Sequence, residues 1–286
     1  MWQNIKTAFL LALLDGLFLA VGGILFHGRG LVTAAVIALL INALSYWNSD
    51  KLAVAAARGV QVSPAEAPEL HRIVDELCAE ANMPKPRVYI CEDPSPNAFA
   101  TGRNPKHAAV CCTSGILNLV SARELRGVLA HELSHVRSRD ILTASLAATI
   151  ALAISFLANM ALWFGAFGGF GGRDNEDANP LLILLVALLA APAAAIIQLA
   201  ISRAREYDAD YHGAELSHDP LALANALRKL ETVTRQVPMQ VAPAIAPLYI
   251  VNPFGGRKVS MSQLFSTHPP LEERIARLER MAATGS

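Results

Sequence analysis

Leu129–Asp140 has the sequence LAHELSHVRSRD and contains the pattern H-E-x-x-H at His131, Glu132 and His135. Residues four apart in a helix lie one turn apart on the same face, so both imidazoles can reach one metal ion. Zinc prefers nitrogen and sulfur ligands in a tetrahedron, and a carboxylate beside it can take a proton from an attacking water. The pattern therefore predicts two zinc ligands, His131 and His135, and a general base, Glu132.

The residues before this pattern predict that it lies on a helix. Glu124–Ala130 has the sequence ELRGVLA, in which Leu125, Val128 and Leu129 form an apolar stripe. Ser121 and Glu124 have the spacing of a capping box at the start of that helix. The alternative is a surface helix with incidental histidines, and the apolar stripe disfavours it.

The composition indicates a membrane protein. Hydrophobic residues make up 53% of the 286 residues, and charged residues only 17%, against about 25% in a typical soluble domain. The net charge of zero gives no reason to expect a nucleic-acid partner. The four cysteines form no C-x-x-C pair, so we expect reduced structural thiols in a cytosolic compartment.

Four apolar runs predict a four-helix transmembrane part: residues 7–26, 31–47, 141–167 and 180–201. A signal peptide is the alternative for the first run, but the second run follows it at once. Asp15 lies inside the first run, where we expect a structural pairing rather than a catalytic role. The predicted division is a transmembrane hairpin at 1–47, a first cytoplasmic part at 48–140, a second hairpin at 141–202, and a second cytoplasmic part at 203–286.

The positions of lysine and arginine predict the orientation of these runs. Two basic residues, Arg29 and Arg173, lie on one side. The other side carries seven, namely Lys6, Lys51, Arg58, Arg137, Arg139, Arg203 and Arg205. The positive-inside rule places the richer side in the cytoplasm. Both termini and the H-E-x-x-H helix are therefore expected there.

The metal site needs a third protein ligand, because a catalytic zinc keeps three and leaves one position open. The arrangement H-E-x-x-H-x-x-G-x-x-H is excluded, since its last position here is Ile141. Glu206 is the best candidate, and Asp210, one turn further, could orient a zinc-bound histidine. His212, Glu215 and His218 are rivals for the ligand role. Glu206 and Asp210 could instead pair with arginines at 203 and 205.

Four motifs in order resemble the HtpX family, membrane-bound zinc metalloproteases related to the CAAX prenyl endopeptidases. The motifs are SPNAFATG at 95–102, LAHELSHVRSRD at 129–140, SRAREYDAD at 202–210 and STHPPLEERIARL at 266–278. The resemblance implies one Zn²⁺ per chain, held by His131, His135 and Glu206, with Glu132 as the base. It also implies a zincin-like cytoplasmic protease domain in the cytoplasmic (inner) membrane of a bacterium.

The same resemblance gives a meaning to two further stretches. Asn97, Ala98, Phe99 and Ala100 resemble the family's edge strand, which would hold an extended substrate by strand addition. An ordinary edge strand is the alternative. His268 could approach the site and donate a hydrogen bond to the oxyanion. Capping of the last helix is the alternative for His268.

We therefore expect a mainly helical α+β protein that acts as a membrane-bound zinc endopeptidase. Its expected partners are the lipid bilayer and protein substrates, namely misfolded or damaged membrane proteins cleaved at the cytoplasmic face. One rival is a non-catalytic zinc-binding membrane scaffold, which would need a closed four-ligand site. Another is a transporter, for which Asp15 is the only sign.

Overall fold

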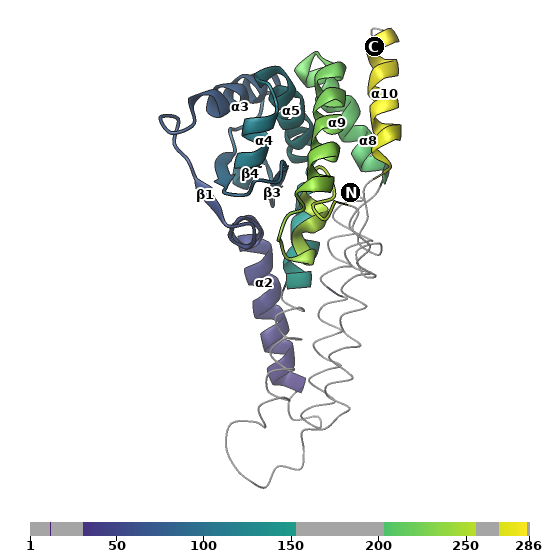
Figure 1. Cartoon of the computed structure of the whole chain (residues 1–286). Helices are drawn as coiled ribbons and strands as arrows, with labels where there is room; N and C mark the ends of the chain where they lie inside the picture. The colour runs from purple at the N-terminus through teal and green to yellow at the C-terminus, as the bar shows by residue number, and fades with distance from the viewer. Residues whose placement is uncertain (1–11, 13–30, 153–202, 256–268, 285–286) are drawn as a thin grey trace.

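The computed structural model describes residues 31–152, 203–255 and 269–284, together with residue 12. These residues form a mainly helical α+β fold, as expected, in which α2 extends away from a compact remainder (Figure 1). The elements in chain order are α2 (Leu31–Ala56), β1 (Gly59–Gln61), α3 (Pro68–Glu80), β2 (Arg87–Cys91), β3 (Ala98–Gly102), η1 (Pro105–His107), β4 (Ala108–Thr113), α4 (Ser114–Leu119), α5 (Ala122–Ser138), α8 (Arg203–Ser217), α9 (Pro220–Gln236), η2 (Pro243–Leu248) and α10 (Leu271–Thr284).

The sheet has four strands in the order β1-β2-β4-β3, so β3 lies at one edge. β2 and β4 run parallel, while β1 and β3 pair antiparallel with their neighbours. Successive side chains in a strand point to opposite faces. In β4, Val110 and Cys112 therefore enter the core beneath α5, and Cys111 enters a second core beside α2. All four cysteines are free and buried, as predicted.

Helix α5 lies at the centre of the compact part. It packs against α3 and β3 on one side and against α8 and α9 on the other. Its first turn has the predicted capping box: Ser121 Oγ accepts from the Glu124 backbone N–H, and the Glu124 carboxylate accepts from the Ser121 N–H. The apolar side chains Leu125, Val128 and Leu129 are buried, which confirms the predicted stripe.

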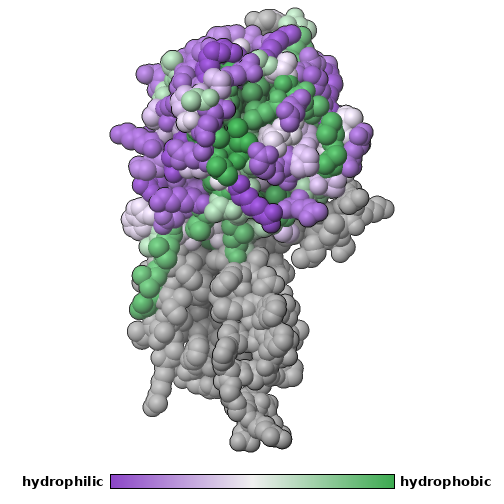
Figure 2. Space-filling view, turned by 60° about the vertical axis from the view of Figure 1, so that its left-hand side comes forward, coloured by the Kyte–Doolittle hydropathy of each residue, from purple (hydrophilic) through white to green (hydrophobic). Residues whose placement is uncertain are grey.

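The described part of α2 carries an apolar stripe on its surface. Val36, Leu40, Leu44 and Trp47 are each more than half exposed, and Figure 2 shows this arm as green below a largely hydrophilic surface. Within the described residues, no helix is long and apolar enough to cross a membrane. Apart from residue 12, the predicted runs at 7–26 and 180–201, with Asp15, lie outside those residues, and so does most of the run at 141–167. The transmembrane part stays a prediction.

One helix begins later than its sequence indicates. Ser63–Glu66 has the spacing of a capping box, which predicts a helix from Pro64, but α3 begins at Pro68. The Glu66 carboxylate does accept from the Ser63 N–H and hydroxyl. Those bonds close an isolated turn, and Pro68 then begins the helix, since proline is well suited to a first helical position.

Candidate metal centre

Helix α5 directs His131, Glu132 and His135 into one buried space. The exposed fraction is 1% for His131 and 2% for Glu132. The two imidazole rings lie edge to face, with centroids 4.8 Å apart. Arg139 ends the helix in the left-handed conformation, with φ 62°, and so turns the following Asp140 back toward His135. The pattern therefore lies on the predicted helix, at its buried C-terminal half.

Glu206 reaches the same space from α8. Its carboxylate oxygens lie 3.9 Å from His131 Nε2 and 3.7 Å from His135 Nε2. The approach of α8 depends on Gly213, because a Cβ there would lie 2.8 Å from the backbone N and Cα of His131. The absence of a side chain at Gly213 thus lets Glu206, the third candidate ligand, come close to the two imidazoles.

These three side chains fit a zinc ion. Each offers one ligand atom, and all three atoms lie within 4.8 Å of one another. Two ligands of one tetrahedral zinc, at their usual bond lengths, are about 3.4 Å apart, so a small contraction would bring the three into place. Among the residues that the structure describes, this cluster is the one with at least three suitable donors close together.

The rivals for the third ligand lie elsewhere on α8. His212 and Glu215 pair with each other at 3.0 Å and are about half exposed. His218 faces solvent beside Glu80. None of them lines the pocket that borders the cluster. The geometry therefore favours Glu206 over all three rivals.

Each of the two histidines has a carboxylate next to its Nδ1 atom. Asp210 Oδ1 lies 3.0 Å from His131 Nδ1, and the other ring nitrogen, Nε2, is therefore the one that faces Glu206. Asp140 Oδ2 lies 3.4 Å from His135 Nδ1. Such pairs fix the tautomer and ring orientation of a metal ligand. The sequence predicted this role for Asp210, but the role of Asp140 became visible only in the structure.

Arg274 from α10 completes the network and was missed by sequence reasoning. Its side chain is fully buried, and it donates to both Asp210 oxygens at 2.7 and 2.8 Å. The pair explains how Asp210 stays charged: burial alone would raise the pKa of Asp210, but the guanidinium holds it below the usual range. Arg274 also lies 3.8 Å from Glu206. Its one sequence signal was its place in the motif STHPPLEERIARL.

Burial and neighbouring charges shift the pKa of the other groups. Burial raises the pKa of Glu132 to about 8, and the charge of Glu206 contributes to the rise. Burial lowers the pKa of His131. For His135 burial acts in the same direction, but the hydrogen bond and charge of Asp140 outweigh it and raise the pKa to about 9. The two imidazoles thus differ in basicity before any metal binds.

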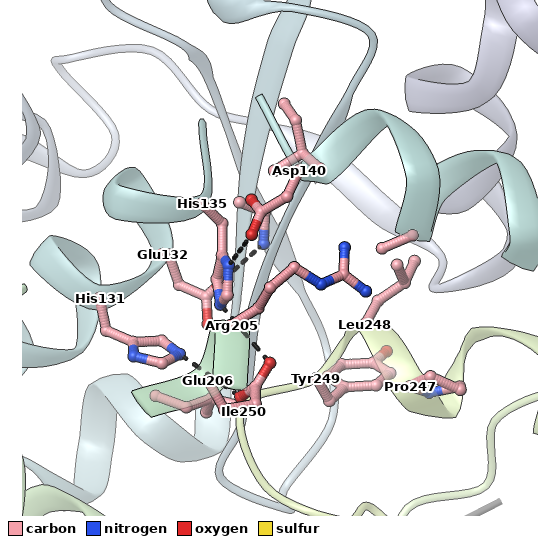
Figure 3. Close-up of a pocket in the computed structure, with 13 residues that line it drawn as sticks. His131, Glu132, His135, Asp140, Arg205, Glu206, Pro247, Leu248, Tyr249 and Ile250 are labelled. Carbon is pink, nitrogen blue, oxygen red and sulfur yellow. Dashed lines mark hydrogen bonds and ion pairs between the residues drawn. The ribbon is translucent and has the colours of Figure 1, made fainter. Parts of the chain in front are cut away.

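The pocket beside the cluster contains Glu132 and one end of the predicted substrate strand. Glu132 Oε2 accepts from the Ala100 backbone N–H at 2.7 Å. Figure 3 shows His131, Glu132 and His135 on one side of the pocket, Pro247, Leu248 and Tyr249 on the other, and Ile250 below Glu206. Asn97, Ala98, Phe99 and Ala100 are all buried. His268 lies outside the described residues.

The sequence of this chain is similar to that of a known protein family. The model of peptidase family M48 matches residues 64–282. The chain belongs to that family. Proteins named protease HtpX homolog from Burkholderia mallei (strain SAVP1) and Burkholderia pseudomallei (strain K96243) are 50% identical to it over 289 residues, covering 100% of this chain and 99% of theirs.

A solved structure has a similar fold. The crystal structure of S. mikatae Ste24p superposes with a TM-score of 0.52 and 20% sequence identity. The match covers 96% of this chain and 65% of that one. At this identity the likeness shows the fold alone, whereas the family and the HtpX homologues identify this chain as a metalloprotease.

The approach of α8 to α5 gives a first prediction. Gly213→Ala should weaken zinc binding roughly tenfold, because overpacking costs about 1–3 kcal/mol and the added methyl pushes Glu206 away from the histidines. Gly127→Ala is the matched control, since its Cβ would meet the Leu223 backbone at 2.8 Å but on the α5–α9 side. The control should lower the unfolding temperature and keep its zinc affinity in competition with a chelating dye. Equal zinc affinities in the two variants would contradict this account of Gly213.

The buried ion pair gives a second prediction. Arg274→Met should lower the free energy of unfolding by about 3–5 kcal/mol, because the buried Asp210 carboxylate loses its guanidinium partner. Arg274→Met combined with Asp210→Asn should lose less than the sum of the single losses, since the double variant no longer buries the charge of Asp210. Denaturant unfolding of the four proteins measures the coupling. Additive losses would mean that the two residues act independently.

Proposed function

We propose that this metalloprotease is a zinc endopeptidase that cleaves extended segments of misfolded or damaged membrane proteins at the cytoplasmic face of a bacterial inner membrane. The observation that carries the proposal is an open three-donor set, His131, His135 and Glu206, with the Glu132 carboxylate beside it in one pocket. Three protein ligands with one free position are typical of catalytic zinc.

The bound zinc would supply a Lewis acid that polarises the scissile carbonyl and lowers the pKa of the attacking water. Glu132 acts as the general base, taking the proton of that water and returning it to the leaving amine. The Ala100 N–H fixes one Glu132 oxygen at 2.7 Å, so the carboxylate is held in one orientation. Asp210 and Asp140 hold the imidazoles through Nδ1.

His268 is proposed as the donor that stabilises the oxyanion. Its support is its place in the chain, because Arg274, six residues later, is fully buried against Asp210 beside the metal cluster. The first turn of α10, which follows His268 in the chain, therefore lies close to the site. A donor placed where negative charge develops is a large term in peptide hydrolysis.

The membrane part of the proposal has separate support. Hydrophobic residues form 53% of the chain, the four apolar runs have the length of membrane spans, and basic residues are concentrated on one side of them. The exposed stripe on α2 continues this apolar character into the described residues. Lipid and membrane-embedded substrates are partners consistent with such a chain.

A non-catalytic scaffold with a structural metal is the second candidate. A closed site would need a fourth protein ligand. In the described part of the chain, Asp140 and Asp210 face the Nδ1 atoms of the histidines instead, and the Glu132 carboxylate accepts from the Ala100 N–H. This arrangement favours a catalytic zinc site over a closed structural one.

The different roles of two glutamates give the test. Glu132→Gln keeps the size of the side chain but cannot accept a proton, so it should bind one zinc and lose about 10²–10⁴-fold in turnover. Glu206→Gln should lose zinc affinity, because an amide oxygen is a poorer ligand for a dication than a carboxylate. Casein cleavage and metal content of detergent-purified full-length protein measure both. Extra zinc should restore part of the activity to Glu206→Gln and none to Glu132→Gln.

Two results would contradict the assignment. Full zinc and full activity in Glu206→Gln would place the third ligand elsewhere. Metal loss in Glu132→Gln would make that residue a ligand and not the base. Folding is checked by circular dichroism, so that a misfolded variant is not counted as either.

A further inference from the structure

Residues 247–251, with the sequence PLYIV and here named the strap, run along the outer edge of β3. The Ile250 N–H donates to the Ala98 carbonyl at 3.0 Å. The Asn97 side chain donates to the Val251 carbonyl at 2.9 Å and accepts from the Val251 N–H at 3.4 Å. The Tyr249 ring packs edge to face on Phe99, with centroids 5.0 Å apart. The chain's own backbone thus occupies the open edge of the sheet.

The strap binds one of the backbone groups of β3 that strand addition would use, and the side chains of Glu132 and Ser145 bind two others. Because β3 is an edge strand paired only with β4 in the described sheet, its other side carries alternate backbone donors and acceptors. On that side the Ala98 carbonyl binds the strap, the Ala100 N–H binds Glu132, and the Gly102 N–H binds Ser145 Oγ at 3.0 Å. An incoming strand therefore has to compete with these contacts.

The same segment covers the catalytic pocket. Pro247, Leu248, Tyr249 and Ile250 all line the pocket, and the first three lie opposite the H-E-x-x-H residues (Figure 3). All four side chains are buried. The strap therefore lies along the edge of β3 and also lines the pocket that contains Glu132.

We propose that the strap is a built-in occupant of the substrate's place, so that the structure is the self-inhibited form and an extended substrate must displace the strap from β3. This inference rests on the proposed function, since it assumes that peptide cleavage occurs in this pocket. It predicts an enzyme that acts on unfolded segments able to form a strand, because only these can replace the strap's backbone hydrogen bonds.

The contacts of the strap fit a segment that can be exchanged. The Ile250–Ala98 bond is the one backbone–backbone hydrogen bond between strap and β3 among the described residues. Asn97 and Arg274 add side-chain bonds to the carbonyls of Val251 and Ile250. The Tyr249 hydroxyl is buried without a partner in the described part of the chain, which disfavours the closed position. An incoming strand that makes several backbone bonds can therefore replace the strap.

The alternative is that the strap is a permanent wall of the site. Ile250→Pro separates the two, since it deletes the N–H that binds Ala98. Tyr249 already has φ −75° and ψ 147°, which suits a residue before proline. Ile250→Val, which keeps the N–H, is the reference variant. Both are measured as zinc-loaded full-length protein in detergent with casein.

If the strap can be displaced, kcat/KM should be roughly two- to tenfold higher in Ile250→Pro than in Ile250→Val, because the loss of one hydrogen bond makes displacement easier by about that factor. The change should come mainly from a lower KM. A folded, zinc-loaded Ile250→Pro with equal or lower kcat/KM would overturn the proposal. If no protein, including the wild type, cleaves casein, the proposed function itself has failed. An active wild type with no gain in Ile250→Pro counts against the strap alone.

Hydrogen exchange provides a second test that does not require Ile250→Pro to fold. Zinc-loaded Glu132→Gln binds casein without cutting it, and amide exchange is followed in the peptide that contains residues 248–251. Displacement by substrate predicts faster exchange at Ile250 and Val251 when casein is added. Unchanged or slower exchange, with casein binding confirmed by ultracentrifugation, would show that the strap is a wall.

Discussion

The ion pair between Arg274 and Asp210 is the interaction on which the site depends. The site gathers several acidic groups and two imidazoles away from water, and a buried charge is costly unless it is paired and hydrogen-bonded. Arg274 binds both Asp210 oxygens, and Asp210 in turn holds His131 by its Nδ1. One cation from α10 thus stabilises the carboxylate that orients His131, a proposed metal ligand on α5.

The candidate metal centre joins parts of the chain that lie far apart in sequence. Two donors come from α5, one from α8 and the supporting cation from α10. Contact between α5 and α8 is close because Gly213 has no side chain. The strap is tied to the same network, since Arg274 also donates to the Ile250 carbonyl at 3.0 Å. In the proposed function, metal binding, the packing of α8 on α5 and access of a substrate to β3 are therefore physically linked.

Local signals in the sequence were reliable where a short pattern has one physical meaning. The capping box at Ser121 and the apolar stripe of α5 were predicted because spacing within a few residues determines them. The box at Ser63 was misleading, since the same bonds can close a single turn. Asp140 and Arg274 were missed for a different reason. Their roles depend on the left-handed turn at Arg139 and on the docking of α10, and neither leaves a spacing pattern in the chain.

X-ray absorption at the zinc edge of the purified full-length protein tests the central claim most directly. If His131, His135 and Glu206 are the ligands, the zinc should have two imidazole nitrogens, and its other neighbours should all be oxygen atoms. All of these atoms should lie at about 2.0–2.2 Å from the zinc, with no sulfur. Glu206→Cys should then add one sulfur at about 2.3 Å and keep both imidazoles. Sulfur scattering in the wild type, or a spectrum that Glu206→Cys leaves unchanged, would contradict the proposed ligand set.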